Sequence, residues 1–503
     1  MFEAFENKKM KKLLDKFLDI WSVAYAGSLL GWDTETYMPA SSIKERSIVF
    51  GRLTVLAQRM LLSPEFRELV NQAEKEEKLN DFEKGVIRVL KREIRIFEKL
   101  PPEFVEEFEK LTAEAKVVWR KAKEKSDFSI FEPYLTKIVD MSRKKAELLG
   151  YDEHPYDALL DLFEEGLKTR EVEDMFGNLK PSLVDILKRI RNSDGYRDKH
   201  PLEKEKYDIE KMKQLNKKIL ELFGFDFNRG RLDISAHPFT NSMGIFDVRI
   251  TTRYAGYDFR RSLLAVIHEF GHGLYELQID EKLMATPIAT GVSLGVHESQ
   301  SRFWENMIGR SLAFVETNFD LLKEFLPFLE KYQISDVYRY FNLVRPELIR
   351  VESDEVTYNQ HIILRFEIEK GLIEEKLDVS ELPQIWNENM DRILGIRPPN
   401  DALGVLQDIH WSMGAIGYFP TYSIGTILAV QIARKMESEI GNLSDLIHEK
   451  KYGEIRTWLK DKIHRWGSTY PPKELIKRAL GENMNVRYFI DHLERKYKHL
   501  YAI

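Results

Sequence analysis

Two histidines and a glutamate interrupt an otherwise apolar stretch, RSLLAVIHEFGHGLYELQ, which runs from Arg261 to Gln278. Apolar residues at this spacing predict a buried helix. On such a helix His268 and His272, four residues apart, lie on one face and one turn apart. Because buried polar groups need partners, the segment predicts a helix that lines a functional site.

The order His268-Glu269-x-x-His272 is the HExxH arrangement of zinc peptidases. Two imidazoles on one face can chelate one ion, and Glu269 can reach a water molecule that the ion activates. The metal lowers the pKa of that water towards about 7 and polarises the scissile carbonyl. The glutamate takes the proton and later delivers it to the leaving amine. The plain alternative is a pair of ordinary core or surface histidines.

The third ligand decides between metallopeptidase classes. A metzincin would have a histidine where this chain has Gln278, so that pattern fails. Glu298 stands 26 residues after His272, at the start of a helix-like run. Two His and one Glu leave a fourth position for water, which is the catalytic arrangement. Glu276 competes, but three ligands on one straight helix fit a tetrahedral ion poorly, so we favour Glu298. Glu305 is either a supporting carboxylate or a surface charge.

Composition narrows the function classes. The chain has 503 residues, no cysteine and a net charge of −6. Without thiolates, a metal site must use His, Asp or Glu. The acidic balance argues against nucleic-acid binding, which needs clustered Lys and Arg. The N-terminus lacks the apolar core of a signal peptide, so a cytoplasmic location is expected. Charged residues make up 31%, above the roughly 25% that is typical, which is compatible with heat adaptation.

One uncharged segment, Trp411 to Ala433, is long enough to span a membrane. Gly417, Pro420 and Gly425 interrupt it, and several polar residues dilute it. We therefore expect a buried loop followed by a core helix and no membrane partner.

The chain as a whole reads as mostly α, with two lobes around a deep active-site groove. Short alternation with β-branched residues between Arg231 and Tyr254 predicts a small strand or hairpin next to the helix of His268. The polar segment 191–205 predicts a surface connection, and Pro346 a helix start or kink. We expect residues 1–503 to form a single catalytic domain, with a helical part over 1–200 and all catalytic motifs in 201–503.

Six motifs make the sequence resemble the thermostable metallocarboxypeptidase family, zinc enzymes that remove C-terminal residues. The motifs are HPF at His237–Phe239, DVRIT at Asp247–Thr251, HEFGH at His268–His272, HESQ at His297–Gln300, IRVESD at Ile349–Asp354 and GVLQDIHW at Gly404–Trp411. They cover the C-terminal two-thirds of the chain in the family's order.

The resemblance implies His268, His272 and Glu298 as metal ligands and Glu269 as the general base and acid. It also implies one Zn²⁺ per subunit, which Co²⁺ can replace, and a homodimer. Its substrates are peptides with a free C-terminus, cleaved with broad specificity.

A carboxypeptidase must recognise the terminal carboxylate, and the fork of an arginine does this best. Arg350 in IRVESD and Arg249 in DVRIT are the candidates, and with the resemblance we favour Arg350. The alternatives are a helical ion pair from Arg350 to Asp354 and a solvated strand charge at Arg249.

The uncharged stretch around residue 418 supplies candidate donors for the oxyanion of the tetrahedral intermediate. Tyr422 is the first choice and His410 the second, with Tyr418 beside them. His237 is expected to contact substrate or support the site. Gln407 and Asp408 are weaker candidates for the same roles. The alternative for the tyrosines is ordinary core aromatics.

Three other functions share some of these features. An endo-oligopeptidase, or an enzyme that releases C-terminal dipeptides, would use the same metal site. An aminopeptidase would need an acidic anchor for the free amine, and we find no matching segment. A helical interaction protein with a structural metal site would have no use for the base Glu269.

Overall fold

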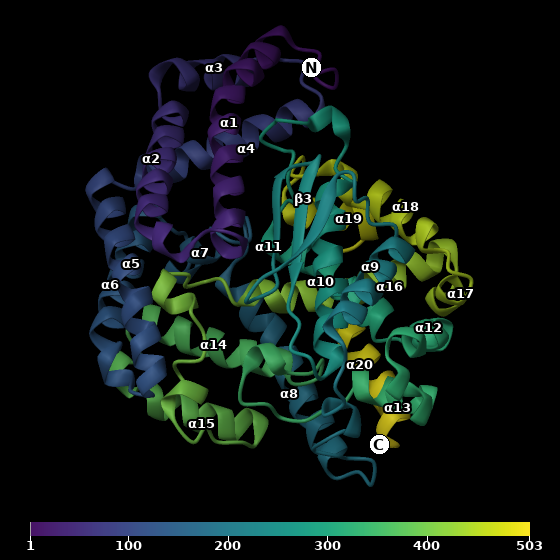
Figure 1. Cartoon of the computed structure of the whole chain (residues 1–503). Helices are drawn as coiled ribbons and strands as arrows, with labels where there is room; N and C mark the ends of the chain where they lie inside the picture. The colour runs from purple at the N-terminus through teal and green to yellow at the C-terminus, as the bar shows by residue number, and fades with distance from the viewer. Residues whose placement is uncertain (1) are drawn as a thin grey trace. The chain divides into compact units, whose positions relative to one another are not determined.

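The structure is a computed structural model that describes residues 2–503 (Figure 1). Over this range the chain forms twenty α-helices and a three-stranded sheet, so the predicted mostly helical fold is confirmed. The chain divides into two compact units, and each is assembled from three separate segments. Unit 1 comprises residues 1–98, 200–341 and 428–484, and unit 2 comprises residues 99–199, 342–427 and 485–503. These units do not follow a boundary at residue 200 alone, and the single catalytic domain stays a prediction.

Unit 1 contains the sheet and most of the helices. Its helices are α1 (Lys8–Thr36), α2 (Ile43–Leu61), α3 (Pro64–Glu74), α4 (Asp81–Lys99), α9 (Ile209–Phe223), α10 (Phe259–Leu277), α11 (Leu294–Arg302), α12 (Leu312–Phe325), α13 (Ile334–Phe341), α17 (Leu443–His448), α18 (Tyr452–Lys462), α19 (Pro472–Leu480) and the larger part of α16 (Pro420–Ile440). A helical turn of the π type, Phe303–Gly309, follows α11 directly.

Unit 2 is helical throughout the residues that the structure describes. Its helices are α5 (Pro102–Lys125), α6 (Glu132–Leu149), α7 (Pro155–Leu160), α8 (Thr169–Arg191), α14 (Tyr358–Ile373), α15 (Leu382–Leu394), α20 (Val486–Tyr501) and the first turns of α16. The predicted surface connection lies between α8 and α9, where the chain passes from unit 2 to unit 1.

The predicted hairpin is present and belongs to a larger sheet. Strands β2 (Thr240–Gly244) and β3 (Asp247–Thr252) pair antiparallel, whereas β1 (Gly230–Ile234) pairs with β3 in parallel, in the order β1-β3-β2. The buried side chains of β3 include Val248 and Ile250, and they pack against α10. The sheet therefore forms one wall behind the helix that carries His268.

Local signals mark several helix ends. Proline occupies the first position of α5, where no backbone N–H is needed. Gly150, with a φ of +76°, ends α6. The prediction for Pro346 was wrong, because it lies in an extended connection between α13 and α14. There the Val344 N–H donates to the Tyr501 hydroxyl, and the Arg345 N–H donates to the Asp354 carboxylate. Arg345 also precedes the proline, a position that disfavours the helical conformation.

The segment 411–433 folds as expected from its composition. Residues 411–419 form a short turn and a mostly buried loop, and α16 begins at Pro420. Among residues 2–503 we find no helix with both the length and the apolar character needed to cross a membrane.

Candidate functional site

Helix α10 carries His268 and His272 on one face, with their ring centroids 5.0 Å apart. Two glycines on the helix allow close packing around it. A Cβ at Gly271 would lie 2.4 Å from the carbonyl oxygen of Gln300 on α11, and one at Gly273 would lie 3.1 Å from Ile250 on β3. Only a residue without a side chain permits this approach of α11, which brings the HESQ segment beside the two histidines.

Glu298 on α11 completes the candidate ligand set. Its Oε2 lies 3.6 Å from Nε2 of His268 and 3.3 Å from Nε2 of His272. One ligand atom from each of the three residues falls within 4.8 Å of the others. The competing Glu276 instead accepts hydrogen bonds from the Gly291 N–H and contacts His297, and Gln278 contacts His464. The geometry therefore agrees with the set predicted from the sequence.

Two of the three side chains have protonation states that suit metal binding, which needs an ionised carboxylate and neutral imidazoles. His268 differs, because Glu298 and Glu305 outweigh the effect of burial and raise its pKa. Burial alone would raise the pKa of Glu298, but Arg302 and the two histidines outweigh it and hold that pKa well below 4.5. The Arg302 Nε donates to Glu298 Oε1 at 2.7 Å. Burial also lowers the pKa of His272 to about 4.

His268 is oriented by a second buried glutamate. Its Nδ1 lies 2.9 Å from Oε2 of Glu305, and Arg310 pairs with the other oxygen of Glu305 at 2.7 Å. Burial opposes ionisation of Glu305, but Arg310 and Arg302 hold its pKa far below the ordinary value. Of the two alternatives for Glu305, the buried supporting carboxylate is the one observed.

Glu269, the candidate base, is 6% exposed and projects towards β2. The Thr240 hydroxyl donates to its Oε2 at 2.6 Å. Burial raises the pKa of Glu269, and the hydrogen bond and His268 oppose that rise. A carboxylate whose pKa is raised by burial accepts a proton more readily.

In unit 2, Arg350 is buried and engaged with Asp408. Its Nε and Nη2 donate to Asp408 Oδ1 at 3.1 and 2.9 Å, and its Nη1 donates to the Tyr358 hydroxyl at 3.0 Å. Arg365 pairs with the other oxygen of Asp408 at 2.5 Å. The alternative of a helical ion pair to Asp354 is wrong, because residues 350–352 form only a short 3-10 turn and Asp354 caps the next segment.

Gln407 and Asp408 both support this arginine. The Gln407 side chain accepts from the Arg350 N–H at 2.9 Å and donates to the Leu348 carbonyl at 3.0 Å. Both ends of its amide are therefore engaged with the backbone that carries Arg350. Asp408 lies between Arg350 and Arg365, which outweigh burial and hold its pKa far below the ordinary value.

His410, Tyr418 and Tyr422 cluster near Asp408. The His410 Nε2 lies 3.3 Å from the Tyr422 hydroxyl, and its ring centroid lies 4.5 Å from that of Phe419. Burial lowers the pKa of His410 to about 4, so the imidazole is neutral near pH 7 and carries one N–H. Tyr418 lies 5.3 Å from Tyr422 between ring centroids.

Glu369 holds the loop that leads to these tyrosines. It is fully buried and accepts hydrogen bonds from the Tyr156 hydroxyl at 2.6 Å, the Trp411 indole at 2.8 Å and the Gly417 N–H at 2.9 Å. Burial raises the pKa of Glu369 to about 7, against the effect of these three donors.

The other two predicted contacts lie in unit 1. Arg249 donates from Nε and Nη2 to both oxygens of Asp247, at 2.8 and 2.7 Å, and stacks on Trp32 at 4.4 Å. It is therefore a paired, largely buried charge and not a solvated one. His237 is exposed, just before β2.

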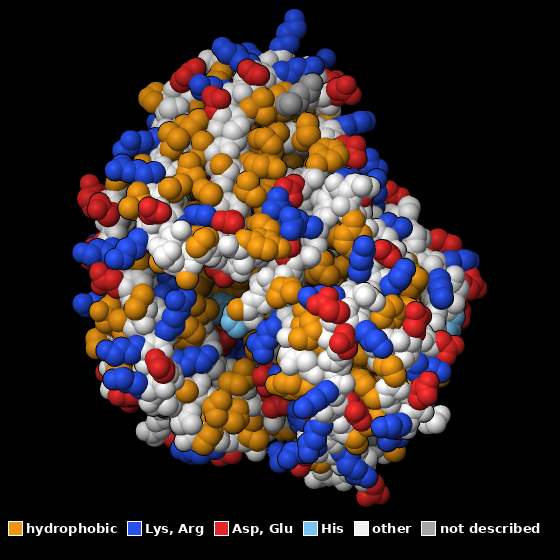
Figure 2. All heavy atoms as spheres, viewed as in Figure 1, with side chains coloured by type: hydrophobic (Ala, Val, Ile, Leu, Met, Phe, Trp, Pro, Cys, Tyr) orange, Lys and Arg blue, Asp and Glu red, His pale blue; other side chains and the backbone are white. Residues whose placement is uncertain are grey.

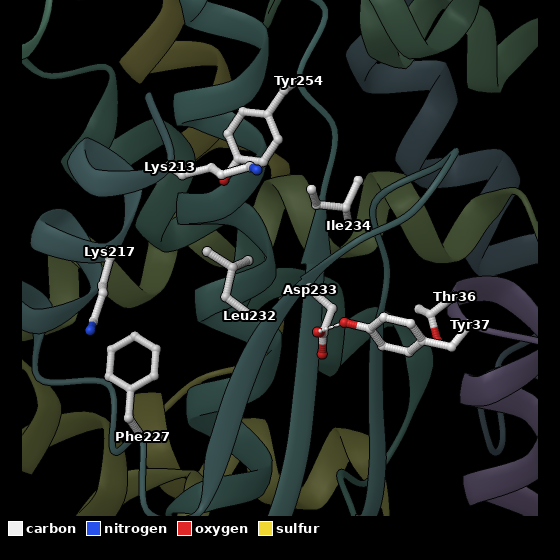
Figure 3. A pocket seen from close by; sticks show the side chains of 9 residues that line it. All are labelled: Thr36, Tyr37, Lys213, Lys217, Phe227, Leu232, Asp233, Ile234 and Tyr254. Carbon is white, nitrogen blue, oxygen red and sulfur yellow. Dashed lines mark hydrogen bonds between the residues drawn. The ribbon is translucent and has the colours of Figure 1, made fainter. Parts of the chain in front are cut away.

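A pocket of about 560 Å³ also lies in unit 1, beside the edge strand β1 (Figure 3). Its lining residues are Thr36, Tyr37, Lys213, Lys217, Phe227, Leu232, Asp233, Ile234 and Tyr254. The Tyr37 hydroxyl donates to Asp233 at 2.6 Å across it. The lining includes none of the site residues predicted from the sequence, so we assign this pocket no part in the chemistry.

Sequence reasoning missed several partners of the site. Arg302 stands four residues after Glu298, so the helical pairing rule could have identified it. Thr240 donates to Glu269 and Arg365 donates to Asp408, each from a separate element. No local sequence pattern predicts either contact. In the sequence, His297 stands out only as part of the HESQ motif, and nothing there indicates its contact with His272.

Comparison with known proteins finds a matching family profile and similar proteins. The family profile described as "Carboxypeptidase Taq (M32) metallopeptidase" matches residues 12–497. The chain is 53% identical over 498 residues to thermostable carboxypeptidase 1 of Pyrococcus furiosus, covering 99% of this chain and 100% of that protein. It is 38% identical to carboxypeptidase 1 of Bacillus subtilis, over 98% of this chain and 99% of that one. The solved structure of the Pyrococcus furiosus carboxypeptidase superposes with a TM-score of 0.97 at 53% identity, over 98% of this chain and 100% of that chain.

Replacing Glu369 with Gln should remove a pH dependence of stability. The pKa is 4.5 when unfolded and about 7 when folded, so the folded state holds the extra proton between these values. Stability conferred by this group should therefore fall as pH rises from 4.5 to 7, by up to about 3 kcal/mol. Chemical denaturation should give a stability difference between the wild type and Glu369→Gln that changes by this amount across the range, whereas the exposed control Glu388→Gln should follow the wild type. Parallel curves for wild type and Glu369→Gln would contradict the assignment.

Proposed function

The chain belongs to the carboxypeptidase Taq (M32) metallopeptidase family and is a metal-dependent carboxypeptidase, and we propose that His268, His272 and Glu298 hold its metal ion. The observation that carries the proposal is the convergence of these three side chains, with ligand atoms within 4.8 Å, beside the buried carboxylate Glu269. We assign Glu269 as the general base and acid.

The donor set fits zinc. Two imidazole nitrogens and one carboxylate oxygen are ligands that zinc prefers, and three protein ligands leave one position open. We propose one Zn²⁺ per subunit, which Co²⁺ can replace. A bound divalent cation supplies Lewis-acid chemistry, polarising the scissile carbonyl and acidifying water.

The side chains around the proposed ligands orient the base and the metal-binding histidine. Thr240 holds Oε2 of Glu269, so the carboxylate keeps one orientation while it receives a proton from the attacking water. Its raised pKa favours retention of that proton until the leaving amine takes it. Glu305 holds Nδ1 of His268 and so directs Nε2 of that ring towards Glu298.

For substrate recognition we propose Arg350 as the carboxylate clamp and Arg249 as the competing candidate. Each guanidinium already forms two hydrogen bonds with an aspartate, which fixes its orientation. Such a preset fork loses little entropy when it binds a carboxylate, although Asp408 or Asp247 then competes for it. Gln407 supports Arg350 through the backbone.

We assign Tyr422, with its hydroxyl near the His410 imidazole, as the oxyanion donor, and His410 as the second choice. Tyr418 and His237 complete the proposed substrate contacts. Tyr418 is half-buried beside Tyr422, and His237 is exposed.

We further propose a homodimer, a heat-adapted protein and a cytoplasmic location. Helix α2 exposes Ile43, Ile48, Val49, Val55 and Leu56, and Figure 2 shows hydrophobic side chains gathered over α1 and α2. An exposed apolar patch of this kind is typical of a protein interface. The charged share of 31% and the absence of cysteine support heat adaptation.

Glu269→Gln should separate metal binding from turnover. The amide keeps the size of the carboxylate but cannot accept the proton, so kcat should fall by roughly 10²- to 10⁴-fold. Zinc content, measured by elemental analysis, should stay that of the wild type. Glu281→Gln, at a glutamate whose side chain is 67% exposed, is the control. Unchanged turnover would show that Glu269 is not the base.

Peptides with a free or an amidated C-terminus should identify the clamp. We expect mass spectrometry to show stepwise loss of single residues from the free acid alone, and only without chelator. Arg350→Met should lower kcat/KM for the free acid by roughly 30-fold, which corresponds to about 2 kcal/mol, the cost of losing a hydrogen bond to a charged group. The preference for the free acid over the amide should fall accordingly. Arg249→Met and the exposed control Arg170→Met should keep it. Loss of the preference in Arg249→Met instead would transfer the clamp to Arg249, and internal cleavage of both peptides would indicate an oligopeptidase.

Charge placed on α2 should disrupt the proposed dimer. Ile48 and Val49 are 66% and 43% exposed, so replacing both with Glu leaves the folded subunit intact but repels a second copy. Light scattering after gel filtration should give about twice the mass of 59.2 kDa for the wild type and that mass for the double variant. A dimer that survives the change would exclude α2 from the interface.

A further inference from the structure

The ring nitrogen of His272 that faces away from Glu298 contacts another histidine. Its Nδ1 lies 2.7 Å from Nδ1 of His297, and Nε2 of His297 lies 3.0 Å from Oε1 of Glu276. His268 differs, because its Nδ1 meets the carboxylate of Glu305 directly. The two candidate metal-binding histidines are thus supported in different ways, one by a carboxylate and one by an imidazole that is itself bound to a carboxylate.

We propose that His297 and Glu276 are positioning residues of the metal centre. Together they hold His272 with its proton on Nδ1 and its Nε2 lone pair directed towards Glu298 and the ion. This inference rests on the proposed assignment of His272 and Glu298 as metal ligands.

The direction of the chain of hydrogen bonds follows from what each group can donate. A carboxylate only accepts, so Nε2 of His297 must carry the proton that reaches Glu276. A neutral imidazole has one N–H, so Nδ1 of His297 is then an acceptor. At 2.7 Å the Nδ1 of His272 must donate to it, which leaves Nε2 of His272 unprotonated. This tautomer is the one that binds a metal through Nε2.

The position of Glu276 is set by the backbone between α10 and α11. The Gly291 N–H donates to Oε1 of Glu276 at 2.8 Å, the same oxygen that meets His297. A Cβ at Gly291 would lie 2.5 Å from Cδ2 of His297, so the turn must have glycine to leave room for the ring. Gly291 therefore orients the carboxylate of Glu276 and leaves space for the imidazole of His297.

The ring of Tyr275 packs against His297, and the ring of His464 packs against Tyr275 in turn. The Tyr275 ring lies 5.1 Å from that of His297 and 4.8 Å from that of His464, between centroids. His464 is buried and contacts Gln278 at 2.7 Å and Gln300 at 2.8 Å through its two ring nitrogens. With Glu276 and Gly291 this leaves His297 little freedom, as a positioning group requires.

The test measures zinc affinity of the full-length apoprotein by competition with a chromophoric chelator. Asn and Leu have nearly the same shape, but only Asn offers an oxygen where His297 has Nδ1. We expect His297→Leu to weaken zinc binding about 10- to 100-fold and His297→Asn to restore most of it. His448→Leu, at a surface histidine paired with Glu316, should bind like the wild type. Equal affinities for wild type, His297→Leu and His297→Asn would overturn the proposal, as would an equal loss in both variants.

His272→Ala separates this inference from the ligand assignment. If His272→Ala keeps wild-type zinc affinity, the assignment of His272 as a ligand is wrong, and the positioning role of His297 and Glu276 is wrong with it. If His272→Ala abolishes tight zinc binding while His297→Leu does not weaken it, only the positioning role of His297 and Glu276 is wrong.

A measurement on the unaltered protein covers the case in which a variant does not fold. Nitrogen NMR of the zinc-loaded enzyme with ¹⁵N-labelled histidine should show protons on Nδ1 of His272 and Nε2 of His297. A proton on Nδ1 of His297 would overturn the proposed direction.

Discussion

The close crossing of α10 and α11 at Gly271 is the contact on which the proposed metal centre depends. One helix carries His268 and His272 and the other carries Glu298, so the separation of the helices sets the distance between the proposed ligands. A side chain at Gly271 would meet the Gln300 carbonyl at 2.4 Å and force the helices apart. Because metal–ligand distances tolerate errors of only about 0.2 Å, a small shift at this crossing would separate Glu298 from the histidines.

Buried charge surrounds the crossing, and each charge has a partner. Glu298 pairs with Arg302, and Glu305 pairs with Arg310. Breaking a buried pair from one side costs about 3–5 kcal/mol, because the other charge is left unsatisfied. These pairs hold both carboxylates ionised, while burial keeps His272 neutral. Unit 2 uses the same principle around Asp408, which lies between two arginines.

Predictions from sequence succeeded where the signal is local. The helix that carries His268 and the β2–β3 hairpin both follow from neighbouring residues. Predictions failed where distant segments compete for a group. Pro346 lies in an extended connection because Tyr501 and Asp354 take its neighbours' N–H groups. Arg350 pairs with Asp408, 58 residues further along the chain, and not with nearby Asp354.

The sequence by itself determined the chemistry available to this protein. The spacing of His268, Glu269 and His272 places two imidazoles and a carboxylate on one helix, because helical geometry depends only on neighbouring residues. The tertiary structure decided which groups join them. It directs Glu276 to His297 and brings Glu298 to the histidines instead. That choice depends on how two helices and a turn pack, and packing is a property of contacts between segments that no single stretch of sequence contains.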